Sequence, residues 1–94
     1  MMNEIDISKF IKTSTEQSIK QDLVTRFKKR RKESKLTQKE LSIRSGVSYG
    51  SIRRFERTGD ISLQALLKLS RILGNLDDFN VIFSKQIATN IKDM

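Results

Sequence analysis

The sequence predicts an all-α fold of five helices in one domain, and three observations support that class. Apolar residues recur at three- and four-residue intervals, capping residues open the segments that carry them, and glycines close most of those segments. The 94-residue sequence contains no proline that would break a helix. A chain of this length, 36% hydrophobic, supports one compact core, which favours helices joined by short connections.

The first helix is expected from residue 15 to about residue 34. The run Ser14-Thr15-Glu16-Gln17 fits a capping box at its start. Ile19, Leu23 and Phe27 follow at four-residue spacing, so they share one face. Four residues further along the same stripe stands Arg31. A guanidinium is therefore expected on the core face of this helix.

The second helix opens with a better capping box. In Thr37-Gln38-Lys39-Glu40 the threonine can accept from the backbone of residue 40 while the glutamate reaches back. This helix is expected to end near Ser45, where Gly46 permits a left-handed turn and Val47 offers an apolar plug. The later helices are marked in the same way: Ser48 caps Tyr49 to Arg57, closed by Gly59; Ser62 caps Leu63 to Leu73, closed by Gly74; and Leu76 to Phe83 is predicted as a fifth.

The fourth helix is apolar around most of its circumference, so it is expected to be the hub of the core. Both ends of the chain stay open. Residues Ile5, Ile7, Phe10 and Ile11 fit a short helix or an edge strand, while Phe83, Ile87 and Ile91 fit a helical stripe although residues 80–83 have strand propensity.

A salt bridge is predicted between the first and third helices. Ile52, Phe55 and Glu56 form an i, i+3, i+4 set, which puts a carboxylate on the core face of the third helix. Burying either charge alone is costly, so Arg31 and Glu56 are expected to pair, with their side chains within about 6 Å. The alternative is two separate surface residues.

Composition removes most enzyme chemistries. The chain has no cysteine and no histidine, which excludes disulfides, thiolate or imidazole metal sites, cysteine nucleophiles and Ser-His-Asp triads. Asp77 and Asp78 are the best remaining catalytic candidates, but acidic residues at a helix start complement its dipole and need no other role. We expect no enzyme activity, catalytic residue, metal or cofactor.

The chain contains no apolar run long enough to cross a membrane, and its first residues are acidic where a signal peptide would be basic. A cytoplasmic, nucleoid-associated protein is expected.

Residues 18–60 hold 13 basic and 5 acidic residues, so the whole net charge of +8 lies in the middle of the chain. Such an excess of basic residues raises the affinity for a polyanion such as DNA, because binding releases counterions. Membrane lipid is the alternative partner, but no basic segment has an apolar face to spare for insertion.

The stretch LTQKELSIRSGVSYGSIRRFE resembles the helix-turn-helix of the Xre/Cro, lambda-repressor-like family, and the likeness extends to about Phe83. A generic helical bundle is the alternative, but it has no reason to combine this spacing with a basic patch. The matching features are Leu36-Thr37-Gln38, Leu41, a small residue at Ser42, Gly46-Val47-Ser48, Ile52, and Glu56 followed by Gly59.

The resemblance implies a DNA-binding domain at 15–83, with an N-terminal extension at 1–14 and a C-terminal tail at 84–94. It implies that the third helix enters the major groove and reads bases through Tyr49, Ser51 and Arg54, while Gly50 allows close approach. Packing of a half-buried ring is the alternative for Tyr49. The expected backbone contacts are Gln38, Lys39, Arg44, Ser48, Arg53 and Arg57, with Lys35 a further candidate clamp.

For the lysines and arginines among these, a merely solvated charge is the alternative. Gln38 is implied either to contact a phosphate or to brace a recognition side chain. The basic run Lys28 to Lys32 resembles a nuclear-localisation signal in composition, but it lies inside a helix, so we discount that interpretation.

One recognition helix spans only about four or five base pairs, so a homodimer on a pseudo-palindromic operator is expected. Its interface would use the fifth helix and tail; the alternative is that this segment closes the monomer core. Within the family the chain looks most like HipB-like antitoxins, which repress their own operon and bind HipA-like kinase toxins. A stand-alone repressor of the phage type, and a protein-interaction module of the same fold without DNA binding, are the other hypotheses.

Overall fold

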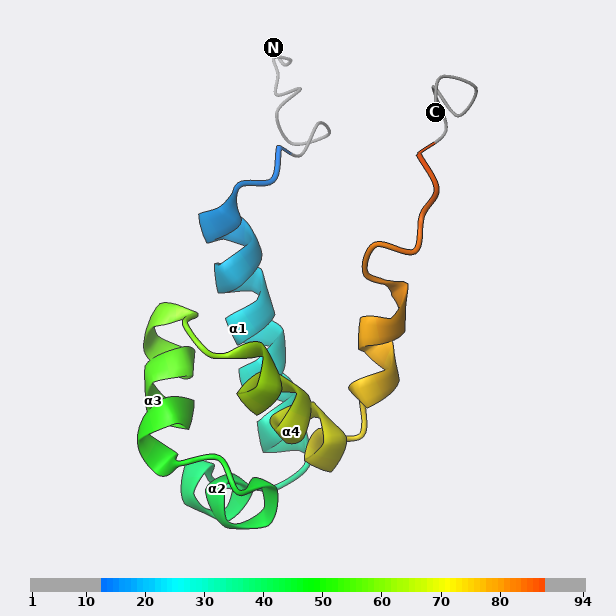
Figure 1. The fold of residues 1–94 in the computed structure, drawn as a ribbon. Coiled ribbons are helices and arrows are strands. Elements are labelled where there is room, and N and C mark those ends of the chain that lie inside the picture. Colours follow the sequence, from blue (N-terminus) through cyan, green and yellow to red (C-terminus); the bar gives the residue numbers. More distant parts are fainter. Residues whose placement is uncertain (1–12, 88–94) are drawn as a thin grey trace.

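A computed structural model describes residues 13–87, which form four α-helices followed by one short 3-10 helix (Figure 1). These residues contain no strand, so the predicted all-α class is confirmed for them. The alternatives left open for Ile5 to Ile11 and for Ile91 lie outside the described residues. The elements are α1 (Glu16–Glu33), α2 (Gln38–Ser45), α3 (Tyr49–Thr58), α4 (Leu63–Leu73) and η2 (Leu76–Val81).

The helix ends follow the capping residues. Thr37 Oγ1 accepts from the Glu40 N–H at 3.0 Å and Glu40 Oε1 accepts from the Thr37 N–H at 2.8 Å, which confirms the predicted capping box of α2. Gly46 follows in the left-handed conformation with φ 81°. Glycines close α3 and α4 in the same conformation, and Ser48 and Ser62 cap their starts.

The start of α1 differs from the prediction by one residue. The capping box is formed by Thr15 and Ser18, not by Ser14 and Gln17: the Thr15 hydroxyl accepts from the Ser18 N–H and the Ser18 hydroxyl from the Thr15 N–H. Two adjacent hydroxyl residues can each cap a helix, and here the reciprocal hydrogen bonds are those of Thr15 with Ser18.

The core is shared among the helices and is not centred on α4. The four largest fully buried side chains come from α2, α3 and α4, and Phe27 of α1 packs edge-on against Phe55 at a centroid distance of 5.0 Å. Leu63, the first residue of α4, is 64% exposed, although a helix at the hub of the core would bury it. Each large side chain fully buried here stabilises the fold by about 1.5–3 kcal/mol. The fully buried four are Leu41, Ile52, Phe55 and Leu69.

The predicted fifth helix is present and begins at Leu76, but it is shorter than expected and has 3-10 geometry. Residues 76–81 form a 3-10 helix with no side-chain cap, and none of its residues is buried. A segment without a cap or a buried face has little to stabilise regular helix geometry, and the β-branched Val81 and Ile82 disfavour its extension. The segment projects from the end of α4 and stands apart from α1 in Figure 1.

No helix within the described range 13–87 is long and apolar enough to cross a membrane.

Candidate nucleic-acid interface

Helix α3 is held by one face and exposes the others. Ile52 and Phe55 are almost completely buried, whereas Tyr49, Ser51 and Arg54 are exposed. At its start, Ser48 Oγ accepts from the Ser51 N–H at 3.0 Å and donates to Ser51 Oγ at 2.8 Å. The three residues predicted to contact bases therefore lie on the solvent side of a fixed helix.

Basic side chains surround the start of α3. The Tyr49 ring lies 5.4 Å from Lys39 Nζ and 5.5 Å from Arg53 Cζ, both measured to the ring centroid. Such cation–π contacts hold two long cations in place on an exposed surface. The structure thus brings together a predicted base contact, Tyr49 of α3, and two predicted backbone contacts, Lys39 of α2 and Arg53 of α3.

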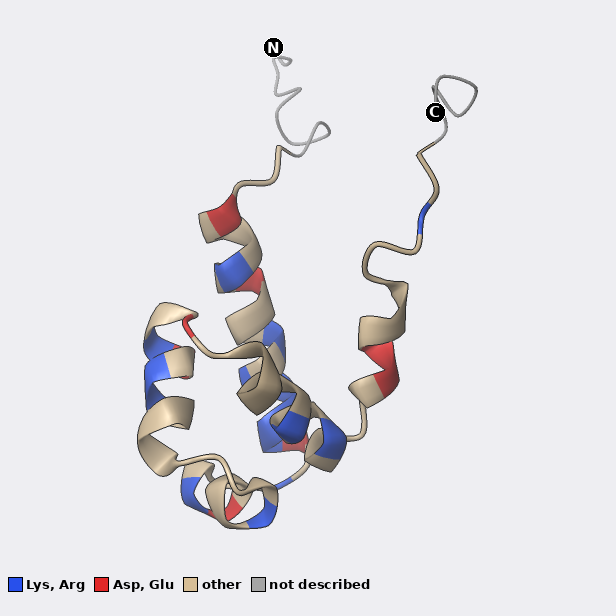
Figure 2. Ribbon diagram, in the orientation of Figure 1, with Lys and Arg blue, Asp and Glu red and all other residues tan. Residues whose placement is uncertain are grey.

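The remaining predicted contacts are spread more widely. Arg57 is in the last turn of α3, and Arg44 is in the last turn of α2, at the opposite end from Gln38 and Lys39. Figure 2 shows that Lys and Arg gather on α3 and on the C-terminal half of α1. The residues predicted to contact DNA therefore lie along the length of both α2 and α3.

A buried polar network ties α3 to α1. Arg31 Nε donates to Glu56 Oε2 at 2.7 Å and Arg31 Nη2 to Glu56 Oε1 at 3.1 Å, so the pair is bidentate. The two side chains are only 10% and 6% exposed. Arg31 Nη1 also donates to the Leu36 carbonyl at 2.9 Å. The residues expected to pair from their places on two apolar stripes are in contact.

Gln38 joins this network from α2. Its Nε2 donates to Glu56 Oε1 at 2.9 Å, and the residue is half-buried. Of the two roles implied for Gln38, bracing a side chain of the recognition helix has a contact in the structure. Glu56 consequently accepts hydrogen bonds from both α1 and α2, which fixes α3 against both helices.

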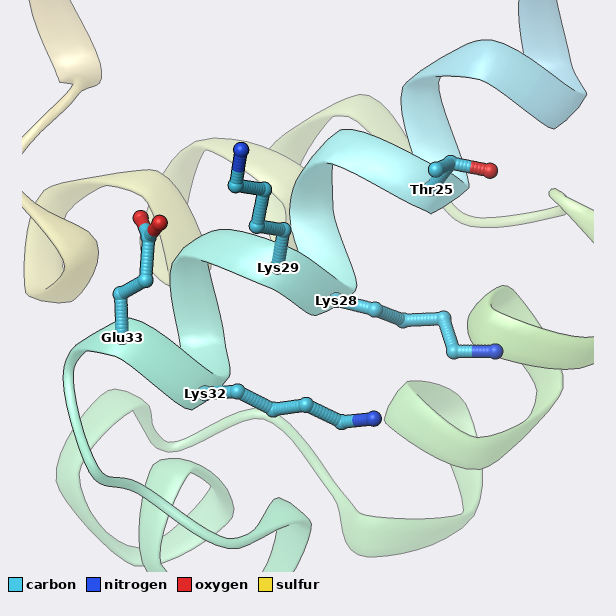
Figure 3. Close-up of a pocket in the computed structure, with 5 residues that line it drawn as sticks. All are labelled: Thr25, Lys28, Lys29, Lys32 and Glu33. Carbon is cyan, nitrogen blue, oxygen red and sulfur yellow. The ribbon is translucent and has the colours of Figure 1, made fainter.

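Two lysines of α1 were missed as interface candidates. Lys28 and Lys32 extend side by side in the same direction, while Lys29 points another way (Figure 3). The shallow hollow that they line includes Thr25, which also lines a neighbouring hollow with Glu56 and Arg57. Their i, i+4 spacing was the available signal, because it places both on one helix face. We call Lys28 and Lys32 the α1 lysine pair.

An acidic residue also lies at this surface and was not predicted. Asp60, in the α3–α4 loop, accepts from Lys20 Nζ at 2.8 Å and lies 3.8 Å from Arg54 Nη2. The hydrogen bond from Lys20 lowers the pKa of Asp60, and the charges of Lys20 and Arg54 lower it further. A hydrogen bond from the backbone of Thr37 likewise lowers the pKa of Glu40. Both carboxylates are therefore ionised at neutral pH.

The part of the chain that the structure describes has no cluster of acidic side chains able to hold a metal ion. A largely apolar hollow of about 520 Å³ forms a groove between α1, α4 and η2. The apolar side chains in its wall are Leu23, Phe27, Leu66, Leu73, Phe79 and Ile82.

Comparison with protein families gives a match. The model described as Helix-turn-helix covers residues 27–79, more than half of the chain, and includes the whole of α2, α3 and α4. The chain matched no curated protein and no solved structure with significance.

Proposed function

Because the chain belongs to the Xre/lambda-repressor-like helix-turn-helix family, we propose that it is a sequence-specific regulator of transcription that inserts α3 into the major groove of double-stranded DNA. The observation that carries this proposal is the division of α3 into a buried holding face and an exposed face. A helix that reads bases must be fixed in position and yet leave its reading side chains free.

Base reading in this proposal rests on Arg54, with Ser51 and Tyr49 beside it. The Arg54 side chain is 65% exposed, and a guanidinium can bind O6 and N7 of a guanine in bidentate fashion. Ser51 can donate to several base edges, and the Tyr49 ring can contact a thymine methyl group. Gly50 lies between Tyr49 and Ser51, and open space where its Cβ would stand permits close approach to the DNA.

Backbone contacts position α3 without choosing a sequence. We assign them to the exposed cations of α2 and α3, to the Ser48 cap, and to Gln38, whose amide NH2 has a second hydrogen to donate beside the one given to Glu56. The N-terminus of α2 carries a partial positive charge that also favours phosphate. The proposed backbone contacts are Gln38, Lys39, Arg44, Ser48, Arg53 and Arg57.

The proposed binding unit is a homodimer that places two copies of the domain at 15–83 on a pseudo-palindromic operator, with the fifth helix and the tail in the interface. The apolar groove between α1, α4 and η2, and the exposed apolar side chains of the segment that follows η2, support this arrangement. Phe83 is 98% exposed and Ile87 is 72% exposed, which is unusual for a segment that closes a monomer core. A dimer doubles the number of base pairs read.

We further propose that the bound dimer represses transcription by occupying its operator, and that it serves as the antitoxin of a toxin–antitoxin operon. Support for the antitoxin role comes from the resemblance of residues 48–79 to HipB-like antitoxins. Co-expression with the product of the adjacent gene, followed by affinity purification, tests it. A stable complex supports an antitoxin, whereas its absence supports a stand-alone repressor.

A protein-interaction module of the same fold is the competing function. The concentration of cations on α3 and α1 argues against it (Figure 2). Titration against salt separates the two, because DNA binding weakens steeply as salt rises while an apolar interaction does not.

The decisive experiment is selection of bound sequences from a random pool of duplex DNA, repeated with Arg54→Ala. We expect a palindromic motif that loses its guanine preference at one position per half-site in the variant. Arg71→Ala removes an exposed arginine from α4 and is the matched control. Recovery of no motif by the wild-type chain would overturn the proposed function, and uniformly weaker binding by Arg54→Ala would reduce Arg54 to a phosphate contact.

A further inference from the structure

Asp60 is a carboxylate beside the exposed arginines of α3. The left-handed Gly59 ends α3, and the loop then folds back along its last turn, where the Asp60 N–H donates to Thr58 Oγ1 at 3.1 Å. Thr58 Oγ1 in turn donates to the Arg54 carbonyl at 2.8 Å. These bonds keep Asp60 beside Arg54, one turn back along the helix.

The two oxygens of Asp60 have different neighbours. Oδ1 accepts from Lys20 Nζ at 2.8 Å, and Oδ2 lies 3.8 Å from Arg54 Nη2. The contact with Lys20 anchors the carboxylate to α1, which passes so close to the loop that a Cβ on Gly59 would lie 2.9 Å from Lys20 Cβ. Both side chains of the Lys20–Asp60 ion pair are nearly half exposed, so the position of Asp60 beside Arg54 rests mainly on the backbone hydrogen bond to Thr58. Arg54 is a long side chain with most of its surface exposed.

The same residues border one shallow hollow, lined by Ser51, Arg54, Asp60, Ile61, Ser62 and Ala65. Two of the proposed base contacts and Asp60 thus face the same space. DNA that brings a base to Ser51 and Arg54 also brings its phosphates toward a negative charge. A carboxylate repels phosphate, but it leaves one edge of the arginine fork available to a guanine.

We propose that Asp60 is a positioning residue that holds Arg54 for base reading and opposes its use as a phosphate contact. The inference rests on the proposed role of α3. An unrestrained arginine on this surface binds any phosphate within reach and so strengthens binding to all sequences alike. Asp60 lowers the affinity for non-specific DNA and raises the discrimination between operator and non-operator sequences.

A purely structural role is the competing explanation, in which Asp60 only ties the α3–α4 loop to α1 through Lys20. The two explanations differ in what removal of each partner does. If Asp60 only ties the loop, Asp60→Asn and Lys20→Met lower stability in the same way and leave the base preference unchanged. If Asp60 positions Arg54, only Asp60→Asn relaxes the base preference.

The experiment measures affinity for the selected operator, for the operator with the guanine opposite Arg54 replaced, and for unrelated duplex DNA. For Asp60→Asn we expect tighter binding to unrelated DNA and a guanine preference reduced by about fivefold. For Lys20→Met we expect weaker binding overall with the preference retained. Glu16→Gln removes the same charge from an exposed position at the start of α1 and is the control that leaves both quantities unchanged.

An unchanged guanine preference in Asp60→Asn overturns this inference, while the proposed function stands if Arg54→Ala still loses that preference. If the wild-type chain shows no base preference, both the proposed function and this inference are wrong. Thermal unfolding of each variant shows whether a fall in binding reflects lost structure.

Discussion

Arg31 and Glu56 are charged residues with nearly buried side chains, and their bidentate contact is what makes their burial tolerable. Each would be left without its partner in a single variant, because the other contacts of Arg31 and Glu56, to the Leu36 carbonyl and to Gln38, carry no opposite charge. The pair therefore matters more for what its loss would expose than for its own net energy.

Glu56→Ala is expected to lower the free energy of unfolding by about 3–5 kcal/mol, because it leaves a buried guanidinium unpaired. Urea denaturation followed by circular dichroism measures the change. The exposed Glu33→Ala is the control, with an expected change within about 0.5 kcal/mol. The double variant Arg31→Met, Glu56→Leu should regain much of the loss. A loss below about 1 kcal/mol in Glu56→Ala would contradict the prediction.

Lys35 is strained in the turn between α1 and α2. Its φ is 60°, in the left-handed region, where a side chain with a Cβ costs about 1–2 kcal/mol. Lys35→Gly is therefore expected to raise the free energy of unfolding by about 0.5–1 kcal/mol.

The control for Lys35→Gly is Lys32→Gly, within α1, where glycine should instead cost about 1 kcal/mol. Urea denaturation of both variants provides the comparison. Destabilisation by both would show that the turn does not strain Lys35.

At the scale of elements, the parts of the fold that depend on neighbouring residues were predictable. Helices α2, α3 and α4 begin and end within one residue of expectation, because hydroxyl caps and left-handed glycines act locally. The type of η2 was not predictable, because an apolar segment becomes a stable α-helix only if something covers it. None of the residues of η2 is buried.

The interface was predictable only in part, for a similar reason. The Arg31–Glu56 contact followed from two apolar stripes that each end in a charge. Spacing along the chain does not encode the contact of Asp60 with Arg54, because that contact depends on how the Gly59 turn directs the loop. Gln38 is the third partner in the buried network, and its contact with Glu56 could not be predicted without knowing the angle between α2 and α3.

The α1 lysine pair offers a test of how far the DNA-binding surface extends beyond the helix-turn-helix. A plot of log affinity against log salt has a negative slope. If Lys28 and Lys32 each contact a phosphate, each substitution by glutamine makes that slope less steep by about 0.9. Lys29→Gln is the matched control, since it removes the same charge from the same helix but from a side chain that points elsewhere (Figure 3). Equal slopes for all three variants and the wild type would restrict the surface to α2, α3 and their loops.

At the scale of the whole molecule, the proposed dimer makes a prediction about the segment after η2. Phe83→Ser combined with Ile87→Ser should convert a dimer into a monomer at tens of micromolar, because it removes the exposed apolar side chains proposed to lie in the interface. Sedimentation equilibrium measures the change.

Ile43→Ser is the control for the dimer interface, because Ile43 is 82% exposed but lies on α2. It should leave the mass unchanged. A wild-type chain that sediments as a monomer and binds half-sites one at a time would contradict the dimer.

The division of α3 into two faces also has a consequence for how such a protein can change over generations. Its stability depends on Ile52, Phe55 and Glu56, whereas its proposed reading positions are exposed, and exposed substitutions usually alter stability by less than about 0.5 kcal/mol. In the proposed function, a new operator can therefore be acquired one substitution at a time, with every intermediate still folded. The same architecture is thus a scaffold on which target preference can be reprogrammed.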